Sequence, residues 1–317
     1  MGQLVDGKWQ ADDAFADETD GRFKRKDSQF RNWVTADGEP GPSGEGGFRA
    51  EPGRYHLYVS LACPWAHRTL IIRRFKGLES MIDVSTVHWL MRDKGWTFAS
   101  GPAVTGDPLH GADYLHQVYT AADPAYTGKV TVPVLWDRSR ETIVSNESAD
   151  IIRMFNTAFD GVGAADGDYY PEDLQPEIDG LNDRIYPTLN NGVYRAGFAA
   201  NQEAYEEAVG PLFDTLDWLE GLLTGSEWLT GDRLTEADIR LFTTLVRFDL
   251  VYHGHFKCNL RRIIDYPALW RYVRAFHGLP GVAETVNVEH IKRHYYESHR
   301  QINPSGVVPR GPLIDFS

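Results

Sequence analysis

The sequence is poor in cysteine, since only Cys63 and Cys258 occur among its 317 residues. So low a count excludes the disulfide framework of a small secreted protein. Long apolar runs are missing as well, and Met1–Gln10 is polar, so the sequence indicates neither a membrane-spanning helix nor a signal peptide. We therefore expect a cytoplasmic protein with no membrane partner, in which a free thiol stays reduced.

Positive charge is also scarce, because 32 Lys and Arg residues stand against 45 Asp and Glu residues, for a formal net charge of −13. Such a surface repels a phosphate backbone, which argues against a nucleic-acid partner. Hydrophobic residues make up 42% of the chain and aromatic residues 12%, which is enough for a packed core. The composition is therefore typical of a folded protein rather than a disordered one.

The first 53 residues show no periodic apolar pattern and are rich in Asp, Gly and Pro. Within them, GEPGPSGEGG (38–47) predicts a loop. Its glycines do not have the spacing of a phosphate-binding loop, so we interpret it as a plain connection. We expect residues 1–53 to form an extended arm that drapes over the folded part.

A mixed pattern of strands and helices begins at Tyr55. It predicts a strand at 55–60, a helix at 61–75, a strand at 82–89, a long insertion of turns and aromatic residues at 90–128, a hairpin of strands 132–137 and 141–145, and a helix at 148–155. Pro64 suits the first turn of the first helix, and Ser148 is the expected N-cap of the last. This order is typical of a thioredoxin-like α/β domain, which we place at 54–160.

Strand patterns are missing beyond Asp160. Apolar residues recur at helical spacing over 209–223 and again after Thr235–Asp238, which has the form of a capping box. Two further helices are predicted, at 268–276 and 282–296. We expect an all-α helical bundle at 161–301, followed by a proline-rich C-terminal extension at 302–317 that is ordered but not helical.

Cys63 lies between a predicted strand and the first turn of a helix. The unpaired N–H groups and the helix dipole there stabilise an anion, which favours the nucleophilic thiolate. A dithiol protein would carry a second cysteine one turn later, but this position is Ala66. A disulfide on Cys63 must then form with a small external thiol and be released by another. The pattern favours glutathione chemistry, with a buried, inert thiol as the alternative. Cys258 has no helix-start pattern and is interpreted as structural.

Two further features could hold glutathione. Val132–Pro133 precedes a strand where thioredoxin-like folds place a cis proline, which leaves the Val132 backbone able to pair with a peptide-like ligand. Glu147 and Ser148 open a helix, whose N–H groups bind a carboxylate well. Either pair alone could be an ordinary turn or cap. Together with Cys63, and in this order, they predict a glutathione site.

Six segments give the sequence a specific resemblance: YVSLACPWAHRTLI (58–71), VTVPVLWD (130–137), IVSNESADIIRMFN (143–156), NNGVYRAGFA (190–199), LTEADIRLFTTLVRFD (234–249) and HYYESH (294–299). With them it closely resembles the glutathionyl-hydroquinone reductases, the Xi class of the glutathione-transferase superfamily, from about Val5 to Pro312. CPWAHR and NGVYRAGFA are specific to this group, whereas TEAD is shared across the superfamily. The resemblance implies the glutathione-transferase fold.

The resemblance also implies a reaction, in which a glutathionyl-hydroquinone and glutathione yield hydroquinone and glutathione disulfide. Cys63 would attack the sulfur of the glutathionyl group and pass through a mixed disulfide with glutathione. Glutathione is then a co-substrate, and no tightly bound cofactor is implied. Superfamily members usually pair, so a homodimer is expected. Chlorinated, menadiol-type and lignin-derived hydroquinones all stay open as substrates.

The resemblance places three phenols in the catalytic site. Tyr194 would donate and accept the proton, and Tyr252 and Tyr295 would help to hold the Cys63 thiolate and the quinone oxygens. The residues implied in glutathione binding are Trp96, Lys129, Val130, Thr131, Val132, Glu147 and Ser148. Trp96 could instead be a packing aromatic of the insertion. The histidine pairs His253/His255 and His294/His299 lack a recognisable metal spacing, so we predict no metal site.

Two other functions share part of this pattern. A general glutathione thioltransferase or dehydroascorbate reductase, similar to the omega class, would use Cys63 but would not need the three tyrosines. A non-catalytic binding or scaffold protein would carry an ordinary thiol at Cys63. Conjugation of glutathione is the least favoured activity, because it needs a serine or tyrosine to activate glutathione's own thiol.

Overall fold

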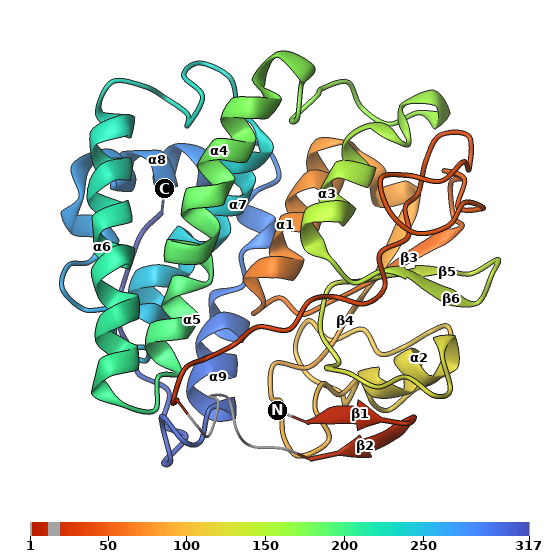
Figure 1. The fold of residues 1–317 in the computed structure, drawn as a ribbon, viewed down its shortest axis with the longest axis horizontal. Helices are drawn as coiled ribbons and strands as arrows, with labels where there is room; N and C mark the ends of the chain where they lie inside the picture. Colours follow the sequence, from red (N-terminus) through yellow and green to blue (C-terminus); the bar gives the residue numbers. More distant parts are fainter. Residues whose placement is uncertain (1, 12–19, 317) are drawn as a thin grey trace. The chain divides into compact units, whose positions relative to one another are not determined.

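The computed structural model describes residues 2–11 and 20–316, and these form two compact units (Figure 1). The first unit contains the described residues up to 11 together with residues 26–167. The second contains residues 20–25 and 168–316. The N-terminal arm therefore contributes to both units, and each unit is described by itself.

A four-stranded mixed sheet with the order β4–β3–β5–β6 forms the centre of the first unit. Its strands are β3 (Tyr55–Val59), β4 (Ile82–Thr86), β5 (Val134–Asp137) and β6 (Thr142–Ser145). The pair β3–β4 is parallel, whereas β3–β5 and β5–β6 are antiparallel. All five residues of β3 are buried, as expected of a central strand covered on both faces. The predicted thioredoxin-like order of strands is confirmed, although β4 ends three residues before the predicted end at 89.

Helices α1 (Pro64–Phe75) and α3 (Ser148–Thr157) lie side by side in the first unit (Figure 1). Helix α1 begins at Pro64 as predicted, since proline needs no N–H partner in the first turn. The predicted N-cap of α3 is wrong by one residue. Glu147 is the cap, and its side chain accepts a hydrogen bond from the N–H of Ala149 at 3.1 Å.

A helix within the insertion was not predicted. Helix α2 (Leu115–Ala122) lies between β4 and β5 and packs against β6, so the segment 90–128 is not only turns. Its N-cap is Tyr114, a residue type that gives no helix-start signal. The Gln117 side chain accepts the N–H of Tyr114 at 2.9 Å, and the Tyr114 backbone carbonyl accepts the N–H of Gln117 at 3.0 Å. The buried residues Leu115, Val118 and Tyr119 form its apolar face.

The N-terminal arm contains a short hairpin that the sequence pattern also did not predict. Strands β1 (Gln3–Val5) and β2 (Lys8–Gln10) pair antiparallel through an Asp6–Gly7 turn in which both residues have positive φ. The backbone of buried Leu4 exchanges two hydrogen bonds of 2.9 Å with Gly128. Strands of three residues are too short to show a clear alternation of apolar and polar residues.

Among residues 168–316, the second unit contains helices and turns without a ladder of strands, as predicted. Its principal elements are α4 (Gln175–Ile185), the π-turn η4 (Tyr186–Asn190), α5 (Gly192–Gly197), α6 (Gln202–Thr224), α7 (Glu236–Arg247), the π-turn η5 (Phe248–Tyr252), α8 (Pro267–His277) and α9 (Val288–Ser298). Short 3₁₀ turns are η1 (Leu78–Ser80) and η2 (Asp160–Val162) in the first unit, and η3 (Glu172–Leu174), η6 (Ile263–Asp265) and η7 (Ala283–Thr285) in the second.

Helix α7 is the buried centre of this unit, because all twelve of its residues are buried. The predicted capping box at its start is confirmed, since Thr235 and Asp238 cap one another's backbone N–H groups. The helix predicted at 282–296 is interrupted. It consists of η7 and α9, and Asn287 caps α9 by accepting a hydrogen bond from the N–H of His290.

Residues 302–316 form neither helix nor strand. The ring of Phe316 stacks on His277 at 5.3 Å and lies 5.8 Å from Trp270, so the extension packs on α8. In the described part of the chain, every helix is too short or too polar to cross a bilayer.

Candidate active site

Cys63 is the N-cap of α1, with an extended backbone at φ −78° and ψ 123°. Its side chain is partly exposed, and its Sγ lies 3.6 Å from the carbonyl oxygen of Val132. No acidic residue stands in the first turn of α1, and Arg73 and Arg74 lie in its last turn. A thiolate at Cys63 therefore meets the positive end of the helix without a competing carboxylate from that turn.

The second cysteine has the opposite environment. Cys258 belongs to the second unit and is fully buried, and burial raises the pKa of its thiol well above the ordinary value. Both cysteines are free thiols, and Ala66 occupies the place of a resolving cysteine. Cys63 is thus the accessible thiol of the pair.

The peptide bond between Val132 and Pro133 is cis, as expected, and β5 begins at the next residue. The preceding residue, Thr131, is held by the hydroxyl of Tyr119. This hydroxyl donates to the Thr131 carbonyl at 2.9 Å and accepts from the Thr131 N–H at 3.2 Å and from Asn146 Nδ2 at 3.1 Å. Tyr119 therefore joins the segment before the cis proline to the turn before α3.

The side chains at the start of α3 are already engaged. Ser148 is buried, and its hydroxyl lies 3.5 Å from Nη1 of Arg68 on α1. The guanidinium of Arg68 is itself buried and lies over the ring of Trp65, with 4.4 Å from Cζ to the ring centroid. A buried cation beside the first N–H groups of a helix favours an anionic ligand.

The other predicted glutathione residues lie close together in the sequence. Val130 and Val132 are buried, and Lys129 and Thr131 are partly exposed. Trp96 lies apart from them. It is only 6% exposed, and its carbonyl accepts the N–H of Leu115, so Trp96 has a packing role at the start of α2.

In the second unit the structure brings the three predicted tyrosines together. The hydroxyl of Tyr295 on α9 lies 2.5 Å from that of Tyr194 on α5 and 3.0 Å from that of Tyr252 at the end of η5. Burial raises the pKa of both Tyr252 and Tyr295 well above the ordinary value. Neutral phenols in such a chain can pass a proton along it.

Two backbone features position these phenols. Tyr252 is the last residue of the short π-helix η5, and Tyr194 lies four residues after the end of the short π-helix η4. Single turns of π-helix are frequent at functional sites. A Cβ on Gly197 would overlap the ring of Phe256, which stacks on Tyr252 at 5.6 Å and lies edge-on to Tyr194 at 5.5 Å. Glycine at this position of the NGVYRAGFA motif therefore lets the phenylalanine reach the phenols.

Several residues around the phenols were not predicted. Arg25 places its Cζ 5.2 Å from the centroid of Tyr194, and its Nε donates to Asn191 at 2.9 Å. The charge of buried Arg247 lowers the pKa of Tyr252 and Tyr295, against the larger effect of burial. Arginines give no periodic signal in a sequence, so only the tertiary structure identifies these two.

Two of the histidines lie against the phenol cluster. Nε2 of His255 lies 3.2 Å from Nδ1 of His299, and the His299 ring is 5.3 Å from that of Tyr295. Burial lowers the pKa of His255 to about 4 and that of His299 well below its ordinary value. Over the described ranges, no group of three or more His, Cys, Asp or Glu side chains is arranged to hold a metal ion.

Comparison with known proteins agrees with this fold. Residues 62–158 match the N-terminal domain of glutathione S-transferases, and residues 202–275 match their C-terminal domain. The sheet, the cis proline and a cysteine at the start of α1 define a glutathione transferase of the cysteine type.

Two curated relatives match almost the whole chain. The glutathionyl-hydroquinone reductase PcpF of Sphingobium chlorophenolicum is 61% identical over 98% of this chain and 96% of its own. The glutathionyl-hydroquinone reductase YqjG of Escherichia coli is 60% identical over 100% of this chain and 97% of its own. The glutathione-bound structure of YqjG superposes with a TM-score of 0.93, covering 99% of this chain and 97% of that one. The chain belongs to the glutathionyl-hydroquinone reductases, the Xi class of glutathione transferases.

Proposed function

We propose that this protein reduces glutathionyl-hydroquinones to hydroquinones with glutathione. The observation that carries the proposal is the hydrogen-bonded chain of three buried phenols in a protein whose accessible thiol begins a helix. A general thioltransferase needs the thiol but has no use for the phenols. The family to which the chain belongs supports the same activity.

The first step breaks the bond between the aromatic carbon and sulfur. The Cys63 thiolate attacks the sulfur of the glutathionyl group, and a disulfide forms between Cys63 and glutathione. The electron pair of the broken bond stays with the ring carbon, which takes up a proton and leaves as the hydroquinone. Tyr194 supplies this proton, and Tyr252 and Tyr295 stabilise the charge that develops on the phenol and the ring oxygens.

The second step restores the enzyme. The thiolate of another glutathione attacks the mixed disulfide at the glutathione sulfur, and glutathione disulfide leaves together with the Cys63 thiolate. The sum is one glutathionyl-hydroquinone and one glutathione converted to hydroquinone and glutathione disulfide. Because Ala66 replaces a resolving cysteine, the chain itself offers no thiol one turn away to compete for the intermediate.

For glutathione we propose contacts with the segment Lys129–Val132 and with Glu147 and Ser148. The backbone of Val132 before the cis proline pairs with the peptide-like part of the ligand. The start of α3, beside buried Arg68, takes a carboxylate. Trp96 covers the ligand, in addition to its packing role at α2.

We further propose that the protein works as a homodimer in the cytoplasm. The scarcity of cysteine and the single accessible thiol suit a reducing compartment.

The proposed dimer is tested by analytical ultracentrifugation. Sedimentation should give twice the chain mass of 35.8 kDa, and a species of single mass at working concentration would contradict the dimer.

The activity is tested by following glutathione-dependent release of menadiol from glutathionyl-menadiol. We expect rapid turnover by the wild type, none by Cys63→Ser, and a kcat about 100-fold lower for Tyr194→Phe, the order of magnitude of a lost proton donor. Cys258→Ala is the matched control and should keep its turnover, since this thiol is fully buried and its raised pKa keeps it protonated.

The same assay separates the alternative function. If the wild type fails on glutathionyl-menadiol but rapidly reduces the mixed disulfide of glutathione and hydroxyethanethiol, the protein is a general thioltransferase. Equal effects of Tyr194→Phe on both substrates would remove the proposed role of this phenol in protonating carbon.

A further inference from the structure

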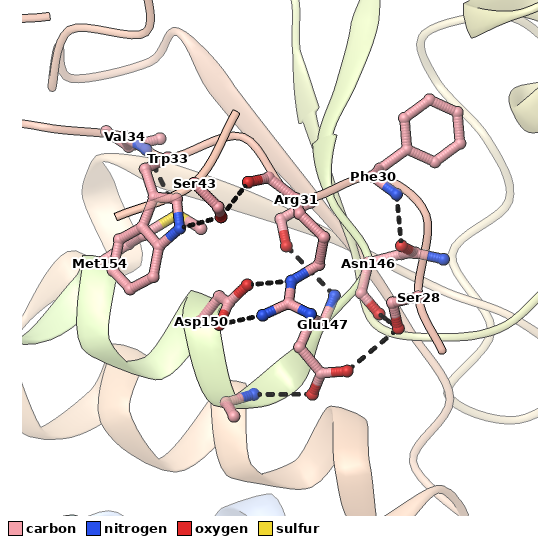
Figure 2. A network of polar contacts seen from close by, with 12 residues as sticks. Ser28, Phe30, Arg31, Trp33, Val34, Ser43, Asn146, Glu147, Asp150 and Met154 are labelled. Carbon is pink, nitrogen blue, oxygen red and sulfur yellow. Dashed lines mark hydrogen bonds and ion pairs between the residues drawn. The ribbon is translucent and has the colours of Figure 1, made fainter. Parts of the chain in front are cut away.

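The arm segment 28–34 runs along β6 and the start of α3 in the first unit (Figure 2). The N–H of Asn32 donates to the Val144 carbonyl at 2.9 Å. Phe30 and Asn146 are joined twice, because the Phe30 N–H donates to Asn146 Oδ1 and the Asn146 N–H donates to the Phe30 carbonyl, both at 3.2 Å. The arm thus continues the sheet beside the turn that leads into α3.

Arg68 of α1 favours an anion at the start of α3, but the charged side chains of α3 itself and of its cap do not. Glu147 and Asp150 both lie within its first turn or cap, and each carboxylate opposes the positive potential of the helix end. A ligand carboxylate at the N–H groups would meet both negative charges. Asp150 is buried, and this burial raises its pKa even beside its cationic partner Arg31.

Arg31 of the arm neutralises Asp150. Its Nε and Nη2 bind the two carboxylate oxygens, with 3.0 Å from Nη2 to Oδ1 (Figure 2). Ser28 contacts the other carboxylate. Its Oγ lies 3.0 Å from Glu147 Oε2 and 3.2 Å from the Asn146 carbonyl oxygen. Oε1 of Glu147 is occupied by the Ala149 N–H. Both carboxylates at this helix start are therefore held by the arm or by the helix itself.

We propose that Arg31 is a positioning residue for glutathione, which acts by neutralising Asp150 so that the start of α3 can hold the α-carboxylate of the γ-glutamyl group. The inference rests on the glutathione site of the proposed function. It assigns the arm a part in ligand binding, which neither its composition nor its loop-like pattern indicates. The guanidinium is needed rather than any cation, because a bidentate pair fixes the carboxylate as well as cancelling its charge.

The test measures the dissociation constant of glutathione by calorimetry, with every variant made in a Cys63→Ser parent so that no turnover interferes. We expect Arg31→Ala to weaken binding about tenfold and Arg31→Lys to weaken it less. The decisive variant is Arg31→Ala combined with Asp150→Asn. It removes the charge that Arg31 offsets, and binding should return to within about threefold of the parent.

Arg140→Ala is the matched control. Arg140 also ties the arm to the first unit, through Glu45 and the Gly46 carbonyl, but it lies on the β5–β6 turn rather than at α3. Its loss should leave the dissociation constant unchanged. Thermal unfolding of each variant shows whether the unit has kept its fold.

A second ligand separates positioning from a merely structural role. The analogue 4-aminobutyryl-cysteinylglycine lacks the α-carboxylate, so its affinity should be the same in the parent and in Arg31→Ala. Equal weakening of both ligands, or no recovery in the double variant, would overturn the inference while the glutathione site stands. A parent that binds no glutathione would overturn the proposed function and this inference together.

Discussion

At the scale of single residues, position in the fold decides what each cysteine can do. Cys63 caps a helix and stays partly exposed, whereas Cys258 is fully buried with its pKa raised. A buried thiol is protonated and inaccessible, so it cannot act as a nucleophile. The two side chains are chemically identical, and the difference between them comes from the backbone that carries each one.

This difference predicts the labelling pattern of the native protein. Iodoacetamide should add one label, at Cys63, under native conditions and two labels in guanidinium chloride. Peptide mass spectrometry identifies the sites, and Cys63→Ser should take up no label while folded. Native labelling of Cys258 at a comparable rate would show that the second unit opens far more readily than its burial indicates.

At the scale of secondary-structure elements, helical segments carry the phenols, whereas most of the proposed glutathione contacts lie in loops. Tyr194, Tyr252 and Tyr295 come from α5, η5 and α9, and each helix presents one hydroxyl to the cluster. Their meeting depends on close helix approach rather than on sequence neighbours. Gly197 is the clearest case, because it has no side chain where the Phe256 ring passes.

Gly197→Ala should therefore disturb the cluster. The added Cβ would overlap the Phe256 ring, and overpacking of this kind costs about 1–3 kcal/mol of unfolding free energy. Turnover of glutathionyl-menadiol should fall with it, because Phe256 packs on Tyr194 and Tyr252. Chemical denaturation and the menadiol assay measure the two effects.

A second glycine gives the matched control. Gly221 lies in α6 with open space around its Cβ position, so Gly221→Ala should be neutral or stabilise the protein by up to about 1 kcal/mol. If both substitutions have the same effect, the close approach of α5 and Phe256 does not constrain the cluster.

At the scale of the whole molecule, buried histidines make stability depend on pH. Burial lowers the pKa of His255 to about 4, below the value of about 6.5 for an unfolded chain. Between these pH values the unfolded state binds more protons than the folded state. The contribution of His255 to the free energy of unfolding is therefore present above pH 6.5 and is lost as the pH falls toward 4. His299 acts in the same direction, since burial lowers its pKa as well.

The contribution of His255 to the free energy of unfolding can be measured by urea unfolding of the protein between pH 4 and 7. Replacing His255 by Gln removes one titrating group while keeping a polar side chain beside His299. The stability of the wild type relative to His255→Gln should fall by about 2–3 kcal/mol on acidification, since one pKa unit corresponds to about 1.4 kcal/mol. A constant difference across this range would mean that His255 titrates normally in the folded protein.

Much of the fold could be predicted because its signals are local. Three short patterns were enough to predict the element in which each lies. They are the apolar run Tyr55–Val59, the proline at the start of α1 and the capping box Thr235–Asp238. Helix α2 and the β1–β2 hairpin could not be predicted, because a Tyr114 cap and three-residue strands carry almost no local signal. Serine favours the N-cap, which predicts Ser148 at this position, but the cap is Glu147, whose side chain accepts the N–H of Ala149.

The amino-acid sequence by itself predicted Cys63 as the nucleophile and determined the missing resolving thiol and the two fold types, because these depend on residue identity and on short-range periodicity. The meeting of three tyrosines separated by up to 101 positions depended on the tertiary structure. So did the pairing of Arg31 with Asp150 across 119 positions. Such contacts arise when distant segments pack together, and the free energy that joins them comes from burial and complementary charge, which no local pattern records.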